Sequence, residues 1–565
     1  MGTSIWQIRA FKRAEDRPTP KAVYNIRVYY SSIIIAIAGA MIGYDNGFVG
    51  GTLALPSFQA EFGLDKMTTS HANFVSANIA STFQAGCFWG ALFVYPLGHY
   101  YGRKIGLIVA TSIFLVGAIL NCAASSKTGL GIMYAGRILV GLGVGATSNL
   151  GPIYISEIAP PGIRGQLLAM YDIVWQIGGL VGFWINYAVS ETIPVSRKQF
   201  LIPFSVQVIP GGLLLIFVFF LRESPRWLMA EKNSPKGLEN LRWFRKLDES
   251  DEYFRFEVAQ IEESIESRAG AIGLGFLAPI RAVFTSKKIL SRLALTTTLF
   301  IWQNASGINA INYYSPTVFK SIGVGGTDAK LLSTGLFGVI KTVSVFLWMI
   351  FLVESWGRRL TLMVGSTGIS FCMFFLGAYV RIAQPSTVAS SATAGVGNLS
   401  PGGRAAMAFF YLWTMFYSAS WNWTPWIINA EVFDNNIRTF VQAINAAANW
   451  FWSFIMARFT PQMFAKMGKD GYGVYFLFAS LSTLGIVYVF FLIPETKGIP
   501  LEMVDGLFTN EVPAWRAHDH VLNQLSEVRD EFHASPEEKE AVHHFDVVTD
   551  DAHNVASEKN NQAEP

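Results

Sequence analysis

The 565-residue sequence contains few charged residues and few cysteines. Only 15% of its residues are charged, whereas 51% are hydrophobic. A soluble protein of this size would carry more charge and would scatter its apolar residues in amphipathic patterns. The three cysteines, Cys87, Cys122 and Cys372, all lie inside apolar segments, so no disulfide framework is expected. The composition therefore indicates a membrane protein.

Motifs of enzymes are also missing. No His/Cys spacing typical of a metal site and no nucleophile–base motif occurs in a plausible place, since His543 and His544 fall in a polar tail. The glycine-rich GLGVG at 141–145 follows no strand and sits in an apolar run. It predicts close helix packing and not a nucleotide site. We therefore expect no enzyme activity, no cofactor, no metal and no nucleic-acid partner.

Long apolar runs dominate the sequence instead. Crossing the hydrocarbon core of a bilayer as a helix takes about 20 apolar residues. Twelve runs of roughly that length are present, at approximately 28–51, 74–98, 105–124, 129–150, 166–189, 201–221, 292–314, 331–353, 360–382, 405–428, 439–460 and 472–493.

Basic residues predict the orientation of these runs. When the runs are threaded alternately through a membrane, most Lys and Arg fall on one side, which the positive-inside rule places in the cytoplasm together with both termini. The predicted parts are a cytoplasmic tail (1–27), a six-helix bundle (28–222), a cytoplasmic central loop (223–290), a second six-helix bundle (291–505) and a polar tail expected to be disordered (506–565).

The two halves share signatures in the same order. YGRK (101–104) is matched by WGRR (356–359), SEIAPPGIR (156–164) by AEVFDNNIR (430–438), and RESPRWL (222–228) by PETKG (494–498). In the second pair a Glu precedes an Arg by seven residues in both halves. Many secondary transporters are built from such repeats, with the substrate site where the repeats meet.

Four motifs carry a resemblance to a known family. They are PIYISEIAPPGIRG (152–165), RESPRWLM (222–229), QNASGINAINYYSP (303–316) and PETKGIPLE (494–502). They resemble the sugar porter family of the major facilitator superfamily, most closely its fungal quinate permease-like branch, over nearly the whole of 28–505. The resemblance implies an all-α membrane protein whose twelve transmembrane helices form two six-helix bundles that rock about a central cavity.

The resemblance also implies a salt-bridge latch at the cytoplasmic face for the outward-open state. In sequence, Glu157 and Glu431 are the acidic partners nearest to Arg164 and Arg438. Exposed ion pairs contribute only about 0–1 kcal/mol each, but a network need only bias two states of similar energy. The expected gate residues are Arg103, Glu157, Arg164, Glu223, Arg358, Glu431 and Arg438.

Four ionisable residues, Asp45, Arg137, Asp172 and Lys341, lie well inside apolar runs. Such residues are costly in a membrane and are candidates for function, although two opposite charges can also pair simply to fix packing. In proton-coupled sugar porters, an Asp and an Arg at the positions of Asp45 and Arg137 form a pair whose protonation drives transport.

The expected substrate site departs from the family at two charged positions. Lys341 replaces an Asn and Asp172 replaces a Gln, whereas Gln303, Asn304, Asn309, Trp426 and Asn449 resemble cavity residues of the family, Asn304 as an amide in place of a second Gln. The segment WNWTPW (421–426) also replaces the family's Gly-Pro pattern.

A lysine in the cavity predicts an acidic substrate. A sugar that carries only hydroxyl groups does not offset the cost of burying Lys341, because it has no negative charge. A polyhydroxylated carboxylate such as quinate or galacturonate can pair with the lysine. Asp172 could neutralise Lys341, bond hydroxyls or accept a second proton. We therefore expect a proton-coupled symporter in the plasma membrane. The alternatives are a neutral hexose or pentose transporter in which Asp172 pairs with Lys341, and a non-transporting nutrient sensor.

Overall fold

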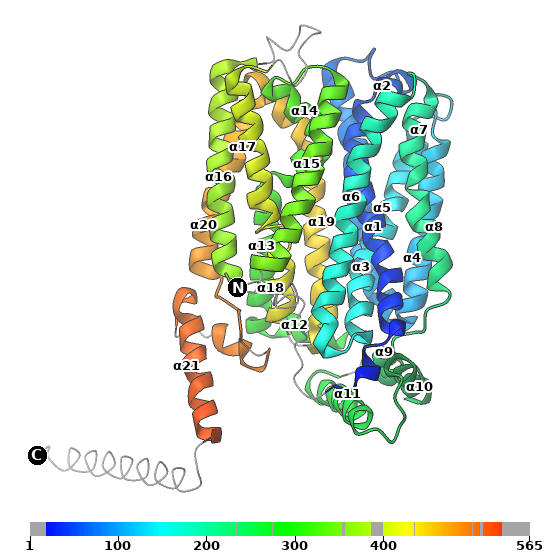
Figure 1. Cartoon of the computed structure of the whole chain (residues 1–565), viewed down its shortest axis with the longest axis vertical. Coiled ribbons are helices and arrows are strands. Elements are labelled where there is room, and N and C mark those ends of the chain that lie inside the picture. The colour runs from blue at the N-terminus through cyan, green and yellow to red at the C-terminus, as the bar shows by residue number, and fades with distance from the viewer. Residues whose placement is uncertain are drawn as a thin grey trace, which may run out of the picture. The chain divides into compact units, whose positions relative to one another are not determined.

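The computed structural model describes residues 19–231, 234–273, 275–352, 356–385, 399–433, 435–499, 501–508 and 512–533. Helices dominate this part of the chain, and all twelve predicted runs coincide with helices (Figure 1). The chain divides into two compact units, Met1–Val489 and Phe490–Pro565. The first unit contains nearly all of the predicted membrane segments.

Five of the first six runs become single helices, and the sixth is divided at Gln207. A short α2 (Pro56–Glu61) follows the first of them. The helices of this half are α1 (Ile26–Ala54), α3 (Thr69–Tyr100), α4 (Gly102–Ala123), α5 (Leu130–Ile158), α6 (Arg164–Thr192), α7 (Arg197–Val206) and α8 (Val208–Val218).

The second half has the same order but two conspicuous breaks. One falls at Ser306–Gly307, where Gly307 has a left-handed φ of 90°, and the other at 419–423. The helices are α13 (Lys287–Ala305), α14 (Ile308–Ile322), α15 (Thr327–Leu347) with a π-helical end η5 (Trp348–Leu352), α16 (Arg358–Ala383), α17 (Pro401–Ser418), α18 (Thr424–Val432), α19 (Asn435–Lys466) and α20 (Tyr472–Leu492).

Glycines allow the helices of the first half to approach closely. A Cβ atom added to Gly141 would lie 2.1 Å from the carbonyl oxygen of Phe83, and one added to Gly145 would lie 2.1 Å from that of Cys87. Helix α5 therefore touches the backbone of α3, as close packing of membrane helices requires. The prediction that GLGVG serves helix packing is confirmed.

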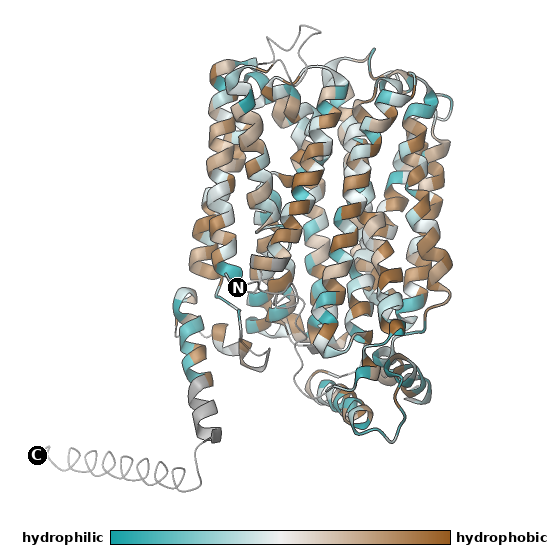
Figure 2. Ribbon diagram, in the orientation of Figure 1, coloured by the Kyte–Doolittle hydropathy of each residue, from teal (hydrophilic) through white to brown (hydrophobic). Residues whose placement is uncertain are grey.

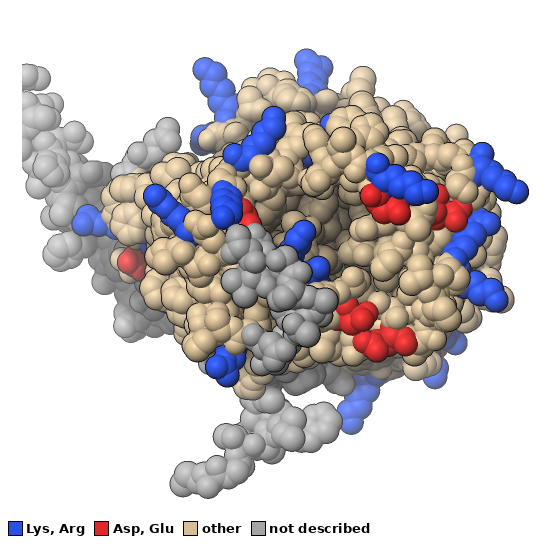
Figure 3. Space-filling model, turned by 90° about the horizontal axis from the view of Figure 1, so that it is seen from above, with Lys and Arg blue, Asp and Glu red and all other residues tan. Residues whose placement is uncertain are grey.

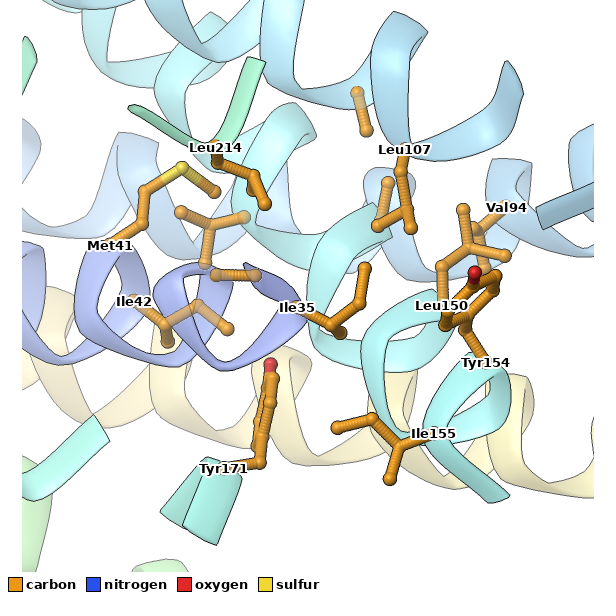
Figure 4. Packing of buried hydrophobic residues seen from close by; sticks show 14 of the residues in the cluster. Ile35, Met41, Ile42, Val94, Leu107, Leu150, Tyr154, Ile155, Tyr171 and Leu214 are labelled. Carbon is orange, nitrogen blue, oxygen red and sulfur yellow. The ribbon is translucent and has the colours of Figure 1, made fainter. Parts of the chain in front are cut away.

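The core of the first half is a continuous set of buried apolar side chains. Ile35 and Ile42 of α1 lie beside Tyr171 of α6, and Leu150 and Tyr154 of α5 extend the same cluster (Figure 4). Between membrane helices such packing stabilises by van der Waals contact. The helices of the first half therefore pack as one unit, which forms one side of the space between the halves.

Eight helical segments in the described residues are long and apolar enough to cross a membrane by composition alone. The remaining four runs correspond to α3, α13–α14, α17–α18 and α19. Brown, hydrophobic residues cover much of the visible helix surface (Figure 2). The α13–α14 and α17–α18 runs are interrupted and, like α19, carry polar residues that face the cavity described below.

The central loop forms four helices: α9 (Pro225–Ala230), α10 (Ser234–Arg245), α11 (Glu252–Ala271) and α12 (Ala278–Thr285). In Figure 1, α9, α10 and α11 lie beneath the first half, whereas α12 lies below α13. Met229, Leu241, Phe254 and Ile261 form a small apolar core among α9, α10 and α11. The loop is therefore a folded layer with its own apolar core.

The expectation of a disordered tail from residue 506 is wrong for Ala514–His533, which forms α21. Ala517 and Val521, four residues apart, lie on one face of α21 and pack on Val504 and Leu507 of η9 (Leu501–Phe508). This apolar stripe at helical spacing stabilises a local helix pair. Residues 534–565, which include His543 and His544, lie outside the described part of the chain.

Candidate functional site

A cavity of about 80 Å³ lies where the two halves meet. Six of the seven expected substrate residues line it: Gln303, Asn304, Asn309, Lys341, Trp426 and Asn449. They come from α13, α14, α15, α18 and α19. The first half contributes Asn46, Trp175 and Gln176. The structure thus brings together residues that are up to about 400 positions apart.

Amide side chains form a connected network on one wall. Asn304 Nδ2 donates to Asn449 Oδ1 at 3.0 Å. Asn309 Nδ2 donates to Asn304 Oδ1 and, at 2.9 Å, to Ser453 Oγ. Because each group is held by another, this wall is preorganised for hydrogen bonding to a polar ligand.

Gln303 stabilises the break between α17 and α18. Its Nε2 donates to the carbonyl oxygens of Trp421 at 2.7 Å and Asn422 at 3.0 Å. These carbonyls lack helical partners because the helix is interrupted there, and a polar cavity is the place where a membrane protein tolerates such a break. Gln303 Oε1 is buried with no hydrogen-bond partner among the described residues, so it remains available to a ligand.

Lys341 projects from α15 into the cavity. It lies in a recess lined by Asn46, Gln176 and Asn312. None of the lining residues is acidic. Within the described part of the chain, Lys341 makes no ion pair or hydrogen bond. The structure therefore presents an uncompensated ammonium group in the site.

The structure does not place Asp172 in this cavity. Among the described residues, Gln176 is the polar α6 side chain that lines it, one helical turn beyond Asp172. No ion pair joins Asp172 to Lys341 in the part of the chain that is described. The expected partnership of Asp172 with Lys341, on which the neutral-sugar alternative depends, is absent from this arrangement.

Several lining residues were missed from the sequence, and they include a group of aromatic side chains. The rings of Trp175 and Trp423, one from each half, meet edge to face with centroids 5.7 Å apart. Trp450 also lines the cavity. The indole Nε1 atoms of Trp423 and Trp450 are buried without a hydrogen-bond partner in the described chain. The unusual WNWTPW segment was the available signal for Trp423.

Asp45 and Arg137 form the expected ion pair inside the first half. Asp45 Oδ1 and an Arg137 guanidinium nitrogen are 2.8 Å apart, and both side chains are fully buried. Arg137 also donates through Nε to the carbonyl oxygen of Ile79 at 3.3 Å, and it lies over the ring of Phe83. Asp45 Oδ2 is buried with no partner among the described residues. Arg137 is thus better anchored than Asp45.

The ion pair connects to the cavity through the next residue. Asn46 lines the cavity and accepts a hydrogen bond from the Tyr313 hydroxyl of α14. Tyr313 lies in the second half, just beyond the break at Gly307. Helix α1 therefore links the buried pair on one face to a contact between the halves on the other.

At the end of the first half that adjoins α9, Arg103 pairs with Glu157 at 2.7 Å. Glu223 accepts hydrogen bonds from the backbone N–H groups of Arg103 and Lys104, both at 3.0 Å, at the start of α4. A helix N-terminus favours such an anion. Burial nevertheless raises the pKa of Glu223, against the effect of these hydrogen bonds.

The second half repeats the first of these contacts, with Arg358 and Glu431 2.7 Å apart. Arg438 donates to the carbonyl oxygen of Phe433 at 3.0 Å. Arg164, expected to use Glu157, makes no ion pair with any described residue, because Glu157 on the last turn of α5 reaches across to α4. The partner nearest in sequence is thus not the partner in space for Arg164.

Comparison with known proteins agrees with this architecture. The family model described as "Sugar (and other) transporter" matches residues 31–508. A probable quinate permease from Aspergillus terreus is 54% identical over 524 residues, which cover 93% of this chain and 94% of that protein. The corresponding protein from Aspergillus clavatus is 55% identical over 524 residues, 93% of this chain and 95% of that protein.

Solved structures show the same fold. The proton:xylose symporter XylE bound to 6-bromo-6-deoxy-D-glucose has a TM-score of 0.69 and 24% sequence identity, covering 85% of this chain and 99% of XylE. The inward-open XylE from E. coli has a TM-score of 0.66, again at 24% identity, covering 85% of this chain and 100% of that chain. The chain therefore belongs to the sugar transporter family and is an all-α, multi-pass membrane protein with the twelve-helix fold of the major facilitator superfamily.

Proposed function

We propose that this transporter is a proton-coupled symporter of a polyhydroxylated carboxylate such as quinate, with galacturonate as the nearest alternative. We further propose that it resides in the plasma membrane with both termini in the cytoplasm. The two halves would rock about the cavity, exposing it to one side at a time. The observation that carries the proposal is the unpaired Lys341 in a cavity of neutral amides and indoles.

Electrostatics make a substrate carboxylate the fitting partner of Lys341. Keeping a lysine near the centre of a membrane helix costs about 2.5–3.5 kcal/mol on insertion scales. A bound carboxylate returns part of this cost through a charge-assisted hydrogen bond, and the amides of Asn304, Asn309 and Asn449 suit hydroxyl groups. A neutral sugar offers Lys341 no opposite charge. The names of the Aspergillus relatives support the same assignment.

The outer face supports an anionic substrate as well. Seen from the side opposite α9–α11, both Lys or Arg and Asp or Glu side chains lie on the face around a hollow in the middle of the molecule (Figure 3). Lys320 lies in the last turn of α14 and Lys330 in the first turn of α15. Lys341 lies eleven residues beyond Lys330 on the same face of α15, about 16 Å along the helix. Arg458 lies over Phe74, and one of its guanidinium nitrogens is buried without a described partner.

None of these three outer cations forms an ion pair within the described residues, and the nearby Asp328 instead accepts a hydrogen bond from Ser190. Unpaired positive charge around an opening attracts anions and raises their rate of entry. We infer that Lys320, Lys330 and Arg458 guide the substrate carboxylate toward Lys341.

The buried pair is proposed to carry the coupled proton. A carboxylate held by Arg137 stays ionised, whereas one that loses this partner in a dry interior takes up a proton. Asp45 is held through one oxygen only, and its neighbour Asn46 touches both the cavity and α14. Movement of the halves would therefore change the environment of Asp45.

Replacing Asp45 should uncouple transport. In Asp45→Asn we expect loss of uphill quinate accumulation with some exchange retained, because Asn cannot bind and release a proton. Asp45→Glu, which keeps an ionisable group, should retain part of the accumulation, and Asp65→Asn on an exposed loop serves as the control. Uptake into cells at acidic outside pH, with and without a protonophore, provides the measurement. Concentrative, protonophore-resistant uptake by Asp45→Asn would remove Asp45 from the mechanism.

Replacing Lys341 should weaken binding of acids selectively. Lys341→Asn removes a charge-assisted bond worth about 1.5–3 kcal/mol, which corresponds to a roughly 10- to 100-fold loss of quinate affinity. Affinity for a neutral sugar should change much less, and Lys341→Arg should retain more of the acid affinity. Apparent affinities are compared at matched surface expression. Unchanged quinate affinity in Lys341→Asn would rule out the carboxylate-binding role.

The cytoplasmic ion pairs are proposed to act as the latch of the outward-open state. The Arg103–Glu157 side chains are only 11% and 12% exposed, against 52% and 80% for the surface pair Arg242–Asp248, so the first pair is less weakened by solvent. In our proposal Glu223 fixes the α4 end, the Arg358–Glu431 pair repeats the arrangement in the second half, and Arg164 and Arg438 assist.

Breaking this latch should shift the protein toward inward-open states. A cysteine placed at Thr439, between the halves on the cytoplasmic side, reports opening through its rate of labelling, with the three native cysteines replaced. We expect Arg103→Gln to label several-fold faster than its parent, whereas Arg242→Gln should label at the parental rate. Equal labelling of all three proteins would contradict the latch.

A further inference from the structure

A second and larger cavity lies apart from the substrate site, at the cytoplasmic side. Its volume is about 150 Å³, and it is enclosed by the ends of α3, α4 and α5, by the central-loop helices α9 and α11, and by α19 of the second half. A smaller cavity of about 40 Å³ shares Glu157, Arg226 and Ile261 with it. Helix α11 lines both cavities, and Figure 1 shows it beneath the first half.

The charges that line these two cavities do not balance. The acids Glu157 and Glu257 are occupied by Arg103 and Arg245 at 2.7 and 2.6 Å. This leaves Arg164, Arg226 and Arg268, none of which makes an ion pair in the described part of the chain. His99 also lines the larger cavity, and the remaining acid, Glu231, is an exposed residue at its rim.

Two of these arginines have unsatisfied buried atoms. Nε of Arg164 and Nε of Arg268 are buried with no hydrogen-bond partner among the described residues. Burial lowers the pKa of Arg268, and the positive charge of Arg103 adds to this effect. A buried N–H group without an acceptor costs roughly 1–3 kcal/mol, so the unpaired Nε–H groups of Arg164 and Arg268 favour an acceptor from outside the chain.

We propose that these two adjoining cavities, together called the chamber, bind a phosphate-type oxyanion from the cytoplasmic side. Guanidinium groups match the oxygens of phosphate with paired hydrogen bonds. Arg226 and Arg268 of the larger cavity and Arg164 of the smaller cavity would supply these donors. The hydroxyl of Ser264, in the larger cavity, would add another. The source of the phosphate group is either a soluble anion or a lipid headgroup.

Binding there would stabilise the closed cytoplasmic side. The walls of the chamber include Arg103 and Glu157 of the first half, Arg268 of the central loop, and Thr439 and Ala443 of the second half. An anion that contacts this enclosure is bound only while the halves and α11 are together, and a ligand shifts an equilibrium toward the state it prefers. The site would thus couple phosphate in the cytoplasm to the conformation of the transporter.

The test uses the full-length protein in nanodiscs of phosphatidylcholine. The thermal unfolding temperature is measured as the concentration of inorganic phosphate is increased, and sodium chloride at the same ionic strength serves as the reference. The same measurement is made separately in discs that contain phosphatidic acid. We expect phosphate to raise the unfolding temperature to a plateau. In the double variant Arg226→Gln/Arg268→Gln, the phosphate concentration that gives half of this effect should be roughly tenfold or more higher. Arg281→Gln, on the exposed surface of α12, should behave as the parent.

The arms of this experiment separate the sources. Stabilisation by inorganic phosphate assigns a soluble anion, and stabilisation by phosphatidic acid alone, lost in the double variant, assigns a lipid headgroup. If the double variant does not fold, Arg268→Gln alone is measured in the same way. Equal effects of chloride and phosphate without any effect of phosphatidic acid, or undiminished stabilisation in the arginine variants, would overturn the proposal.

Discussion

A positive charge held inside a membrane protein without a counter-charge constrains everything around it. Lys341 needs a polar enclosure, and the structure provides one by interrupting α13–α14 and α17–α18 and by turning asparagines, Gln303 and indole groups inward. Interrupted helices are tolerated in a membrane only beside such a cavity. In our account, the described residues that line the enclosure carry one positive charge and no negative charge, and the substrate carboxylate supplies the missing counter-charge.

The same enclosure ties the proposed site to proton coupling and to gating. Asn46 lines the cavity, accepts a hydrogen bond from the Tyr313 hydroxyl and directly follows Asp45. In our proposal, movement at the substrate site would therefore reach the Asp45–Arg137 ion pair. At the end that adjoins α9 and α11, the Arg103–Glu157 pair borders the arginine-lined chamber. Substrate, proton and cytoplasmic anion would thus each act on the same two-state movement of the halves.

The sequence was sufficient for features that depend on composition and on near neighbours along a helix. Twelve apolar runs predicted the helices, and the resemblance to the sugar porter family implied the Asp45–Arg137 pair. It was insufficient where the answer depended on a helix's exact rotation or on tertiary contacts. Gln176 faces the cavity in place of Asp172, because one turn of α6 decides which of them reaches it. Trp175 and Trp423 meet only because the halves assemble.

Calorimetric titration of the purified protein with quinate and with quinate methyl ester tests the central claim most directly. The two ligands share their hydroxyl groups and differ in the negative charge. If Lys341 is the partner of the carboxylate, quinate should bind at least about tenfold more tightly than its ester, the difference expected from one charge-assisted hydrogen bond. Equal affinity for the acid and the ester would contradict the account.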